Sequence, residues 1–260
     1  MIIGRLTQGV RERDWFAVIV ELLVVVVGIV AAFQVDRWWE SRGARLDEAM
    51  YISRLAADVE KDLADVEYAM SLANVRLDFA DFMGEVAADP TKALDRPAYF
   101  IVAVQQAACT YIPSVASQTY DDMSATGNLR LIRDQNVRQA LRDYYTYDES
   151  QRQYRGLNLM VEFRHFELSA GILTAEQMRF VQDRWFVVNE EKLSQVQEAD
   201  PPIGEILAAA ERLRANTEFL DWLPRVSGLQ IDQLNMLNWR EERADSLLET
   251  LRAYSDRIEH

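Results

Sequence analysis

Apolar residues dominate one stretch near the start of the chain, residues 15–33, which read WFAVIVELLVVVVGIVAAF. Glu21 is its single charged residue, and it contains neither proline nor a basic side chain. As a helix this stretch is about 28 Å long, which matches a hydrocarbon core of about 30 Å. Trp38 and Trp39 follow where an aromatic belt would lie. The pattern predicts a transmembrane helix over residues 15–38, after a short tail of residues 1–14.

Within the predicted span, four residues recur at helical spacing and share one face: Glu21, Val25, Gly28 and Ala32. Gly28 and Ala32 form a pair of small residues four apart, which lets a second helix approach closely. A carboxyl group in hydrocarbon is costly and normally faces protein or water. The face therefore predicts contact with a second copy or another membrane protein. The alternative is that Glu21 reaches the nearby membrane interface and is simply tolerated there.

After the span the apolar positions repeat four and three residues apart, a heptad pattern. The seam consists of Ile52, Ala56, Val59, Leu63, Val66, Met70, Ala73 and Leu77. The expected polar face carries Asp58, Glu60, Lys61, Asp62 and Asp65. Such a helix belongs either to a bundle or to a self-associating stalk, and the alanines in the seam favour a bundle. We expect the membrane helix to continue unbroken to about Glu85.

The rest of the chain shows helical patterns separated by helix breakers. Asp95 and Pro97 are expected to cap and open a very apolar helix over 98–109, after a stop at Ala88-Asp89-Pro90. A further helix is expected from 134 to about 169.

Thr174 and Gln177 form a capping box, and the acidic stretch 197–202 predicts an exposed loop or a subdomain boundary. A helix over 203–223 should end at Pro224, and a last seam follows at Leu237, Ala244, Leu251 and Ile258. No stretch alternates with a period of two. The predicted fold is all-α, an N-terminal transmembrane helix that continues into a helical-bundle extracytoplasmic domain, residues 39–260.

Charge and cysteine content narrow the class of protein. The net charge is −14 at pH 7, so the surface would repel a phosphate backbone and we expect no nucleic-acid partner. Cys109 is the only cysteine, which rules out an intrachain disulfide and favours a small buried side chain.

Basic residues flank the span about equally, so orientation is decided by size. A 14-residue tail normally stays in the cytoplasm while a long C-terminal domain is exported, which predicts a cytoplasmic N-terminus and an extracytoplasmic C-terminal domain. A cleaved signal peptide is the alternative, because residues 30–32 could form a cleavage site. The length of the apolar run and Glu21 within it favour a retained anchor.

Groups that could perform catalysis are scarce. Glu162 and His165 have the Glu-x-x-His spacing of di-iron bundles, but no second pair exists, so His165 is expected to be a surface or capping histidine. No nucleophile elbow, phosphate-binding loop or zinc motif is present. We expect no enzymatic activity, no cofactor and no metal site.

The stretch 119–128, TYDDMSATGN, is the most distinctive polar motif. In one interpretation Tyr120, Asp121 and Asn128 form a polar contact site for a ligand or partner. In the other, Thr119 caps a helical turn, Gly127 adopts a left-handed conformation and Asn128 is a turn residue, all serving the fold.

Two stretches resemble a family of uncharacterised bacterial single-pass inner-membrane proteins, one known only as a domain of unknown function. The residues that carry the resemblance are Glu21, Gly28, Gln34, Trp38, Glu40, Arg42, Tyr51, Leu55 and Asp58, then 119–132 with Leu141, Tyr144 and Tyr145. Trp39 departs from the expected polar residue. The resemblance implies the topology and brings no activity, cofactor or catalytic residue.

Three functions remain open at this point. The first is a non-enzymatic scaffold or accessory subunit, anchored in the lipid bilayer, that self-associates as a homo-oligomer or docks another membrane protein. The second is an extracytoplasmic sensor that binds a small ligand between helices and acts through a separate transducer. The third is a proton-coupled single-span subunit whose working group is Glu21.

Overall fold

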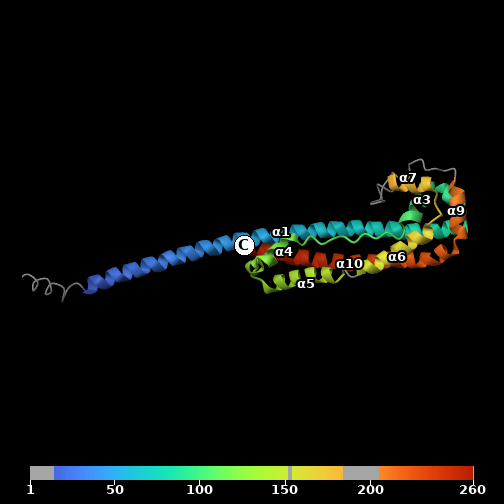
Figure 1. Ribbon diagram of the computed structural model, residues 1–260. Helices are drawn as coiled ribbons and strands as arrows, with labels where there is room; N and C mark the ends of the chain where they lie inside the picture. Colours follow the sequence, from blue (N-terminus) through green and yellow to red (C-terminus); the bar gives the residue numbers. More distant parts are fainter. Residues whose placement is uncertain (1–14, 152–153, 184–204, 260) are drawn as a thin grey trace, which may run out of the picture.

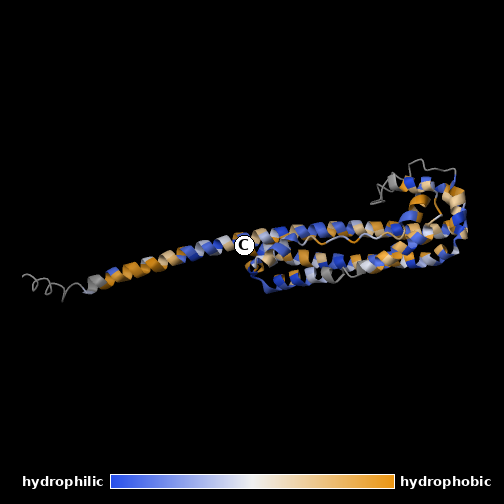
Figure 2. Cartoon of the chain, viewed as in Figure 1, coloured by the Kyte–Doolittle hydropathy of each residue, from blue (hydrophilic) through white to orange (hydrophobic). Residues whose placement is uncertain are grey.

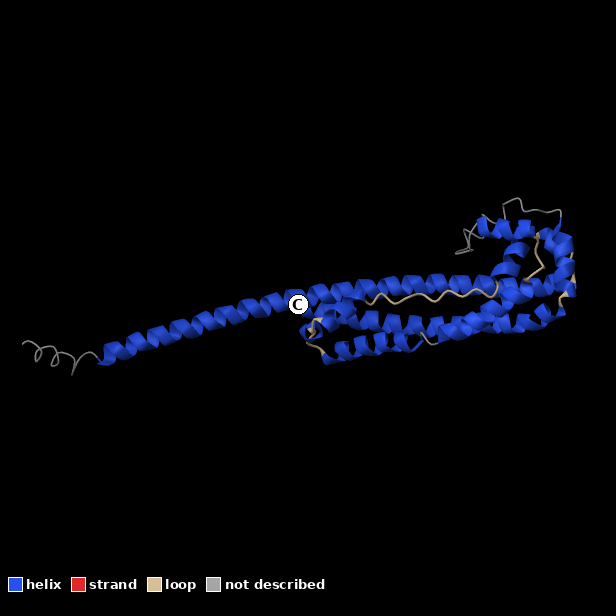
Figure 3. Cartoon of the chain, viewed as in Figure 1, coloured by secondary structure: helices blue, strands red, loops and turns tan. Residues whose placement is uncertain are grey.

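The structure is a computed structural model that describes residues 15–151, 154–183 and 205–259. Throughout these ranges the chain forms helices and connecting loops with no strand, so the all-α prediction is confirmed (Figure 1, Figure 3). The elements are α1 (Trp15–Ala88), α2 (Lys92–Asp95), α3 (Pro97–Gln106), α4 (Gln118–Ala125), η1 (Asn128–Leu131), α5 (Gln135–Gln151), α6 (Tyr154–Ser169), α7 (Ala175–Asp183), α9 (Ile206–Ala215) and α10 (Thr217–Glu259).

Helix α1 determines the shape of the molecule. It is 74 residues long without a break, or about 110 Å at helical rise. Its first third projects from the bundle as an apolar rod, and its remainder forms one side of the bundle (Figure 2). Among the described helices, α1 is the one long and apolar enough to cross a membrane. The predicted continuity of span and heptad segment is confirmed, as is the stop before Asp89-Pro90.

Helix α10 runs back along α1, and its C-terminal end lies beside the middle of α1 (Figure 1). Ile52 and Val59 of α1 share a buried cluster with Leu247 and Leu251 of α10. The heptad segment of α1 therefore belongs to a helical bundle, as its alanines predicted. The C-terminus consequently lies at the end of the bundle nearest the apolar rod.

Half of the predicted seam is wrong. Ile52, Val59, Val66 and Ala73 are fully buried, but their predicted companions Ala56, Leu63, Met70 and Leu77 are only partly buried. The buried companion positions are instead Glu48, Leu55, Asp62, Ala69, Arg76 and Met83, each seven residues from the next. Three of these six are charged, which is why a search for apolar spacing missed them. Asp62 was expected on the polar face and is completely buried.

The end of the bundle far from the rod has its own core, built around α3. All residues of α3 from Ala98 to Gln106 except Gln105 are buried, as the apolar pattern predicted. Pro97 occupies the first turn as expected, but Asp95 ends α2 and Arg96 stands at the N-cap position. Leu213 of α9 and Phe219 of α10 lie in the same cluster as α3.

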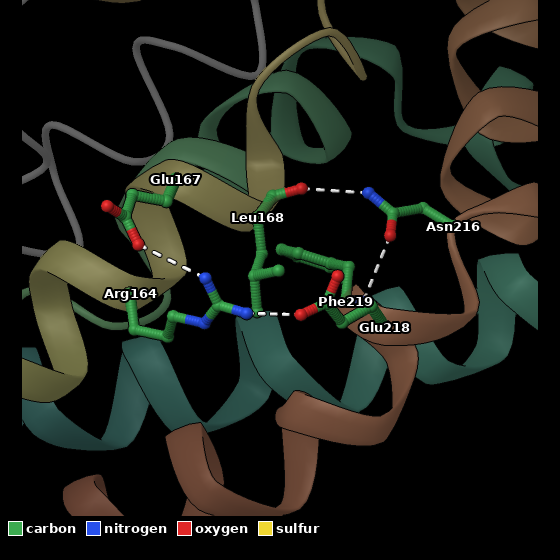
Figure 4. A network of polar contacts seen from close by, with 6 residues as sticks. All are labelled: Arg164, Glu167, Leu168, Asn216, Glu218 and Phe219. Carbon is green, nitrogen blue, oxygen red and sulfur yellow. Dashed lines mark hydrogen bonds and ion pairs between the residues drawn. The ribbon is translucent and has the colours of Figure 1, made fainter.

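The boundary between the last two helices was predicted at the wrong residue. Pro224 does not end a helix but lies inside α10. The break occurs at Asn216, whose side-chain oxygen accepts a hydrogen bond from Phe219 N at 3.0 Å. Its amide nitrogen donates to Leu168 O at 2.8 Å, which ties the start of α10 to the end of α6 (Figure 4). Asn216 is therefore both an N-cap and a link between helices.

An ion-pair group lies beside this junction. Arg164 of α6 pairs with Glu167 on its own helix at 3.2 Å and with Glu218 in the first turn of α10 (Figure 4). The three side chains are substantially exposed, so their pairing contributes little to stability compared with the partly buried hydrogen bonds of Asn216.

Two other helix starts test the capping predictions. Thr174 and Gln177 exchange both bonds of a capping box, at 2.9 and 3.2 Å, so that prediction is confirmed. Helix α4 begins at Gln118 after Ser117, so Thr119 is not its cap. The stretch predicted as one helix from 134 contains α5 and α6, with residues 152–153 outside the described part, and the predicted loop 197–202 also lies outside it.

Candidate functional site

The predicted membrane face lies on the projecting part of α1. Glu21, Val25, Gly28 and Ala32 are all exposed, and a Cβ added at Gly28 would meet no atom within 4 Å. From Ile19 to Gly43 every residue of the helix is exposed. No other described segment of the chain covers this face.

An irregular segment, residues 109–117, lies between α1 and α10 and runs along them (Figure 3). Such a segment leaves backbone groups without secondary-structure partners, and buried backbone groups must be paired. Side chains of α10 pair them. Gln230 Nε2 donates to Ala107 O at 2.9 Å and to Cys109 O at 3.0 Å, and Arg240 Nη1 donates to Pro113 O at 2.6 Å. The buried polar residues of α10 thus hold this segment in place.

Asp62, on α1, also holds the irregular segment in place. Its two carboxylate oxygens accept hydrogen bonds from Ala116 N at 2.7 Å and from the hydroxyl of Tyr144 at 2.8 Å. Burial, and then the charge of Asp62, raise the pKa of Tyr144 far above its usual value. Tyr144 is therefore a fixed donor at neutral pH. The carboxylate has a structural task, to join α1, the irregular segment and α5.

Glu48 plays a comparable role nearer the rod. Its carboxylate accepts hydrogen bonds from the Tyr254 hydroxyl of α10 and from Arg133 N at 2.8 Å. The Arg133 side chain lies 3.6 Å from the second carboxylate oxygen. Glu48 therefore joins α10 and the chain just before α5 to α1, close to the point where the bundle begins.

Arg76 is the third buried charged residue, after Glu48 and Asp62, among the α1 positions that lie seven residues apart. Its Nε and Nη1 atoms are buried without a hydrogen-bond acceptor in the described part of the chain. Burial lowers the pKa of Arg76, while the nearby Cys109 and Glu162 raise it. Glu162 in turn accepts a hydrogen bond from Thr110 N at 3.0 Å. Burial raises the pKa of the Cys109 thiol to about 12, so this thiol is unreactive at neutral pH and behaves as the expected buried side chain.

Of the two predicted places for His165, surface or helix cap, the surface is wrong, because His165 is fully buried, and its ring bonds a carbonyl in the last turn of α3. Its Nε2 donates to Val104 O at 2.9 Å, and its ring lies 5.2 Å from that of Phe219. Burial lowers its pKa to about 4, so the ring is neutral at pH 7. Glu162 of the same pair contacts Thr110 instead. Among the described residues, no group of three or more His, Cys, Asp or Glu could hold a metal ion.

The polar motif 119–128 is used within the fold. Tyr120 stacks on Tyr145 of α5 with ring centroids 4.2 Å apart, and Asp121 accepts a hydrogen bond from Ser117 Oγ at 2.6 Å. Gly127 has φ 72°, the left-handed conformation that favours glycine. Asn128 Nδ2 donates to the Tyr51 hydroxyl at 3.3 Å. These contacts attach the motif to α1 and α5 and support its structural interpretation.

A groove between α6 and α10 has no counterpart in the sequence-based predictions. Its volume is about 430 Å³, and α5 contributes one wall residue. It is lined by Tyr147, Leu157, Asn158, Val161, Arg225, Leu229, Asp232, Gln233, Asn235, Met236 and Trp239. Arg243 stacks over Tyr147 at 4.0 Å beyond Trp239. Most of the lining residues on α10 are three or four residues apart and so share one face of the helix. This spacing is visible in the sequence and could have predicted a face that lines a groove.

In comparisons with known proteins, no family model, no curated protein and no solved structure matches the chain. The resemblance seen in residues 21–58 and 119–145 stays a prediction. The function must be inferred from the residues themselves.

Proposed function

We propose that the protein is a non-enzymatic, membrane-anchored helical scaffold or accessory subunit that self-associates or docks a membrane partner. The observation that carries the proposal is the face of Glu21 and Gly28, which no described part of the chain covers. A carboxyl group and a small-residue pair on one face of an apolar helix are features of contacts between membrane helices. We place residues 15–38 in the bacterial inner membrane, with the bundle on the extracytoplasmic side.

The unbroken α1 supports this assignment. A scaffold must hold its bundle at a fixed position relative to the membrane, and a continuous helix does so without a hinge. The buried polar groups of the bundle also fit a scaffold, because Glu48 and Asp62 join helices to one another. These carboxylates are occupied by structural hydrogen bonds rather than poised for chemistry.

The test compares two changes in the full-length protein, reconstituted in lipid nanodiscs or solubilised in mild detergent. Gly28→Leu adds bulk where helices should touch, so we expect the mass of the assembly to fall. Glu21→Gln keeps the shape and removes the titratable proton, so a scaffold should still assemble and function. Val30→Phe, which also adds four side-chain carbons but at an exposed residue on the opposite side of the helix, is the control.

Two results would overturn the proposal. Unchanged assembly and phenotype with both Gly28→Leu and Glu21→Gln would make the span a plain anchor. Normal assembly with loss of function in Glu21→Gln would instead favour the proton-coupled subunit, because only the ionisable group differs.

A further inference from the structure

We propose that the groove between α6 and α10 binds a single-chain amphipathic ligand, an alkyl chain with an anionic head, whose head lies at the Arg225 end. Fatty acids and single-chain anionic phospholipids share this chemistry. The groove lies in the bundle rather than the span, so this proposal is independent of the scaffold function and can fail separately.

The shape of the groove fits one alkyl chain. Its lining residues on α10 extend from Arg225 to Trp239, about 21 Å at helical rise. The groove is therefore long and narrow for a volume of about 430 Å³. An extended alkyl chain fits such a shape, whereas a helix about 10 Å wide and 21 Å long would occupy roughly 1,600 Å³, more than the groove holds. A docked partner helix could insert only a row of side chains.

The walls of the groove are apolar over most of its length. Leu157 and Val161 of α6 face Leu229 and Met236 of α10 across it. Leu157 is 60% exposed and Trp239 is 63% exposed, although each is a large apolar side chain at the rim. Burying apolar surface stabilises a complex by about 25 cal/mol per Å². An alkyl chain would bury these rim residues, which the fold itself leaves in water.

Charges at the groove give the ligand a direction. Arg225 forms no hydrogen bond or ion pair within the described chain and can receive an anionic head. Asp232 lies seven residues further along α10, about 10 Å away, and would repel an anion placed there. At the other end Arg243 is stacked over Tyr147, so its guanidinium is engaged. The head therefore belongs at Arg225 and the chain runs toward Trp239.

The test uses full-length protein in nanodiscs free of alkyl detergents, with a palmitate analogue that carries a photoactivatable diazirine in its chain. We expect labelled peptides to map to 157–161 and 229–239. Leu157→Glu should reduce labelling about tenfold, because it places a charge against the chain. Phe163→Glu is the matched control, since Phe163 is 66% exposed on the same helix and does not line the groove.

A second pair tests the opposite wall. Trp239→Glu should reduce labelling, whereas Ile231→Glu, 48% exposed on the same helix and outside the groove, should leave it unchanged. All four substituted residues are exposed, so circular dichroism melts should match wild type. Equal labelling in Leu157→Glu and Phe163→Glu, or labelling confined to the span, would overturn the proposal.

The head is tested by competition against the photoactivatable probe. Palmitate should compete about tenfold better than hexadecanol, which has the same chain without the charge, and Arg225→Gln should abolish that difference. Equal competition in the wild type would rule out the anionic head. Lysophosphatidylglycerol is the third competitor, and whether it or palmitate competes better identifies the source of the ligand.

Discussion

At the scale of single residues, the bundle depends on buried polar side chains that serve the backbone of the irregular segment 109–117. Asp62, Gln230 and Arg240 each form a hydrogen bond with a backbone group of this segment, which has no partner in a helix backbone. Leaving a buried donor or acceptor unpaired costs about 1–3 kcal/mol. These residues therefore determine where the segment lies, and their removal should loosen it before the whole bundle unfolds.

Asp62→Ala should lower the free energy of unfolding by about 2–3 kcal/mol, because Ala116 N–H and the Tyr144 hydroxyl both lose their acceptor. Limited proteolysis should also cut the segment around Tyr111 faster. Asp65→Ala, a partly buried carboxylate on the same helix, is the control and should change stability by less than about 0.5 kcal/mol. Equal effects of the two substitutions in urea melts would contradict the role assigned to Asp62.

His165 predicts a dependence of stability on pH. An unfolded histidine titrates near pH 6.5, and burial lowers the folded pKa to about 4. Between these values the unfolded state binds more protons, so the free energy of unfolding falls as pH drops through this window, by up to about 3 kcal/mol. His165→Gln keeps a donor for Val104 O and cannot titrate. Between pH 7 and pH 4 the wild type should therefore lose stability relative to the variant. A difference in the free energy of unfolding that stays constant over this range would show that His165 is not buried and neutral.

At the scale of elements, the sequence predicted helices well and their boundaries unevenly. The stop at Asp89-Pro90 and the capping box at Thr174 follow from local chemistry, so local patterns found them. Asn216 was missed because Pro224 gives the stronger sequence signal for a helix end, although the cap bond of Asn216 to Phe219 is local; its second bond, to Leu168, spans 48 residues.

The buried charged residues of α1 and the groove between α6 and α10 were also missed, because both depend on contacts between distant parts of the chain. Asp62 and Arg76 look like surface residues until the segment and helices that cover them are in place. Likewise the groove exists only where α6 and α10 meet, although the spacing of Leu229, Met236 and Trp239 on one helix is visible in the sequence. Contacts between distant parts of the chain decide both features.

The junction at Asn216 can be tested directly. Asn216→Ala should destabilise the bundle by about 1–2 kcal/mol, because the first turn of α10 loses its cap. Asn216→Ser restores an acceptor and should cost less. Pro224→Ala should not destabilise, since an interior proline disfavours a helix relative to alanine. A larger loss with Pro224→Ala than with Asn216→Ala in thermal melts would place the boundary at the proline after all.

The corrected register of α1 makes a second prediction. Val66 is fully buried, whereas Leu63 of the predicted seam is only partly buried. Val66→Asp should therefore cost at least about 3 kcal/mol, and Leu63→Asp distinctly less, because its carboxylate can reach water. Urea denaturation of the two variants measures the order, and a reversed order would restore the original seam.

At the scale of the whole molecule, one helix carries both the apolar rod and the bundle, and α10 brings the C-terminus back to the start of the bundle. Everything after the rod must therefore lie on one side of the bilayer if the rod spans it. The C-terminus itself should lie near the membrane surface rather than at the far end.

Reporter fusions test this arrangement. With the tail 1–14 inside, a reporter fused after His260 should be active only outside the cytoplasm, and one fused within the loop at Asp89-Pro90 should behave identically. Activity in the cytoplasm at both points would reverse the orientation. Purified protein whose N-terminal residue is Phe33 would show instead that the span is removed.

Because α1 is unbroken, its length determines how far the bundle stands from the membrane and how the bundle is rotated about the helix axis. Ala88 stands about 80 Å beyond Phe33 along α1. Seven residues inserted between Trp39 and Glu48 would raise the bundle by about 10 Å and turn it by only about 20°. Four inserted residues would raise it by about 6 Å and turn it by about 40°. The two insertions therefore change the height and the orientation of the bundle in different proportions, and a partner bound at a fixed distance from the bilayer would respond more strongly to the seven-residue insertion.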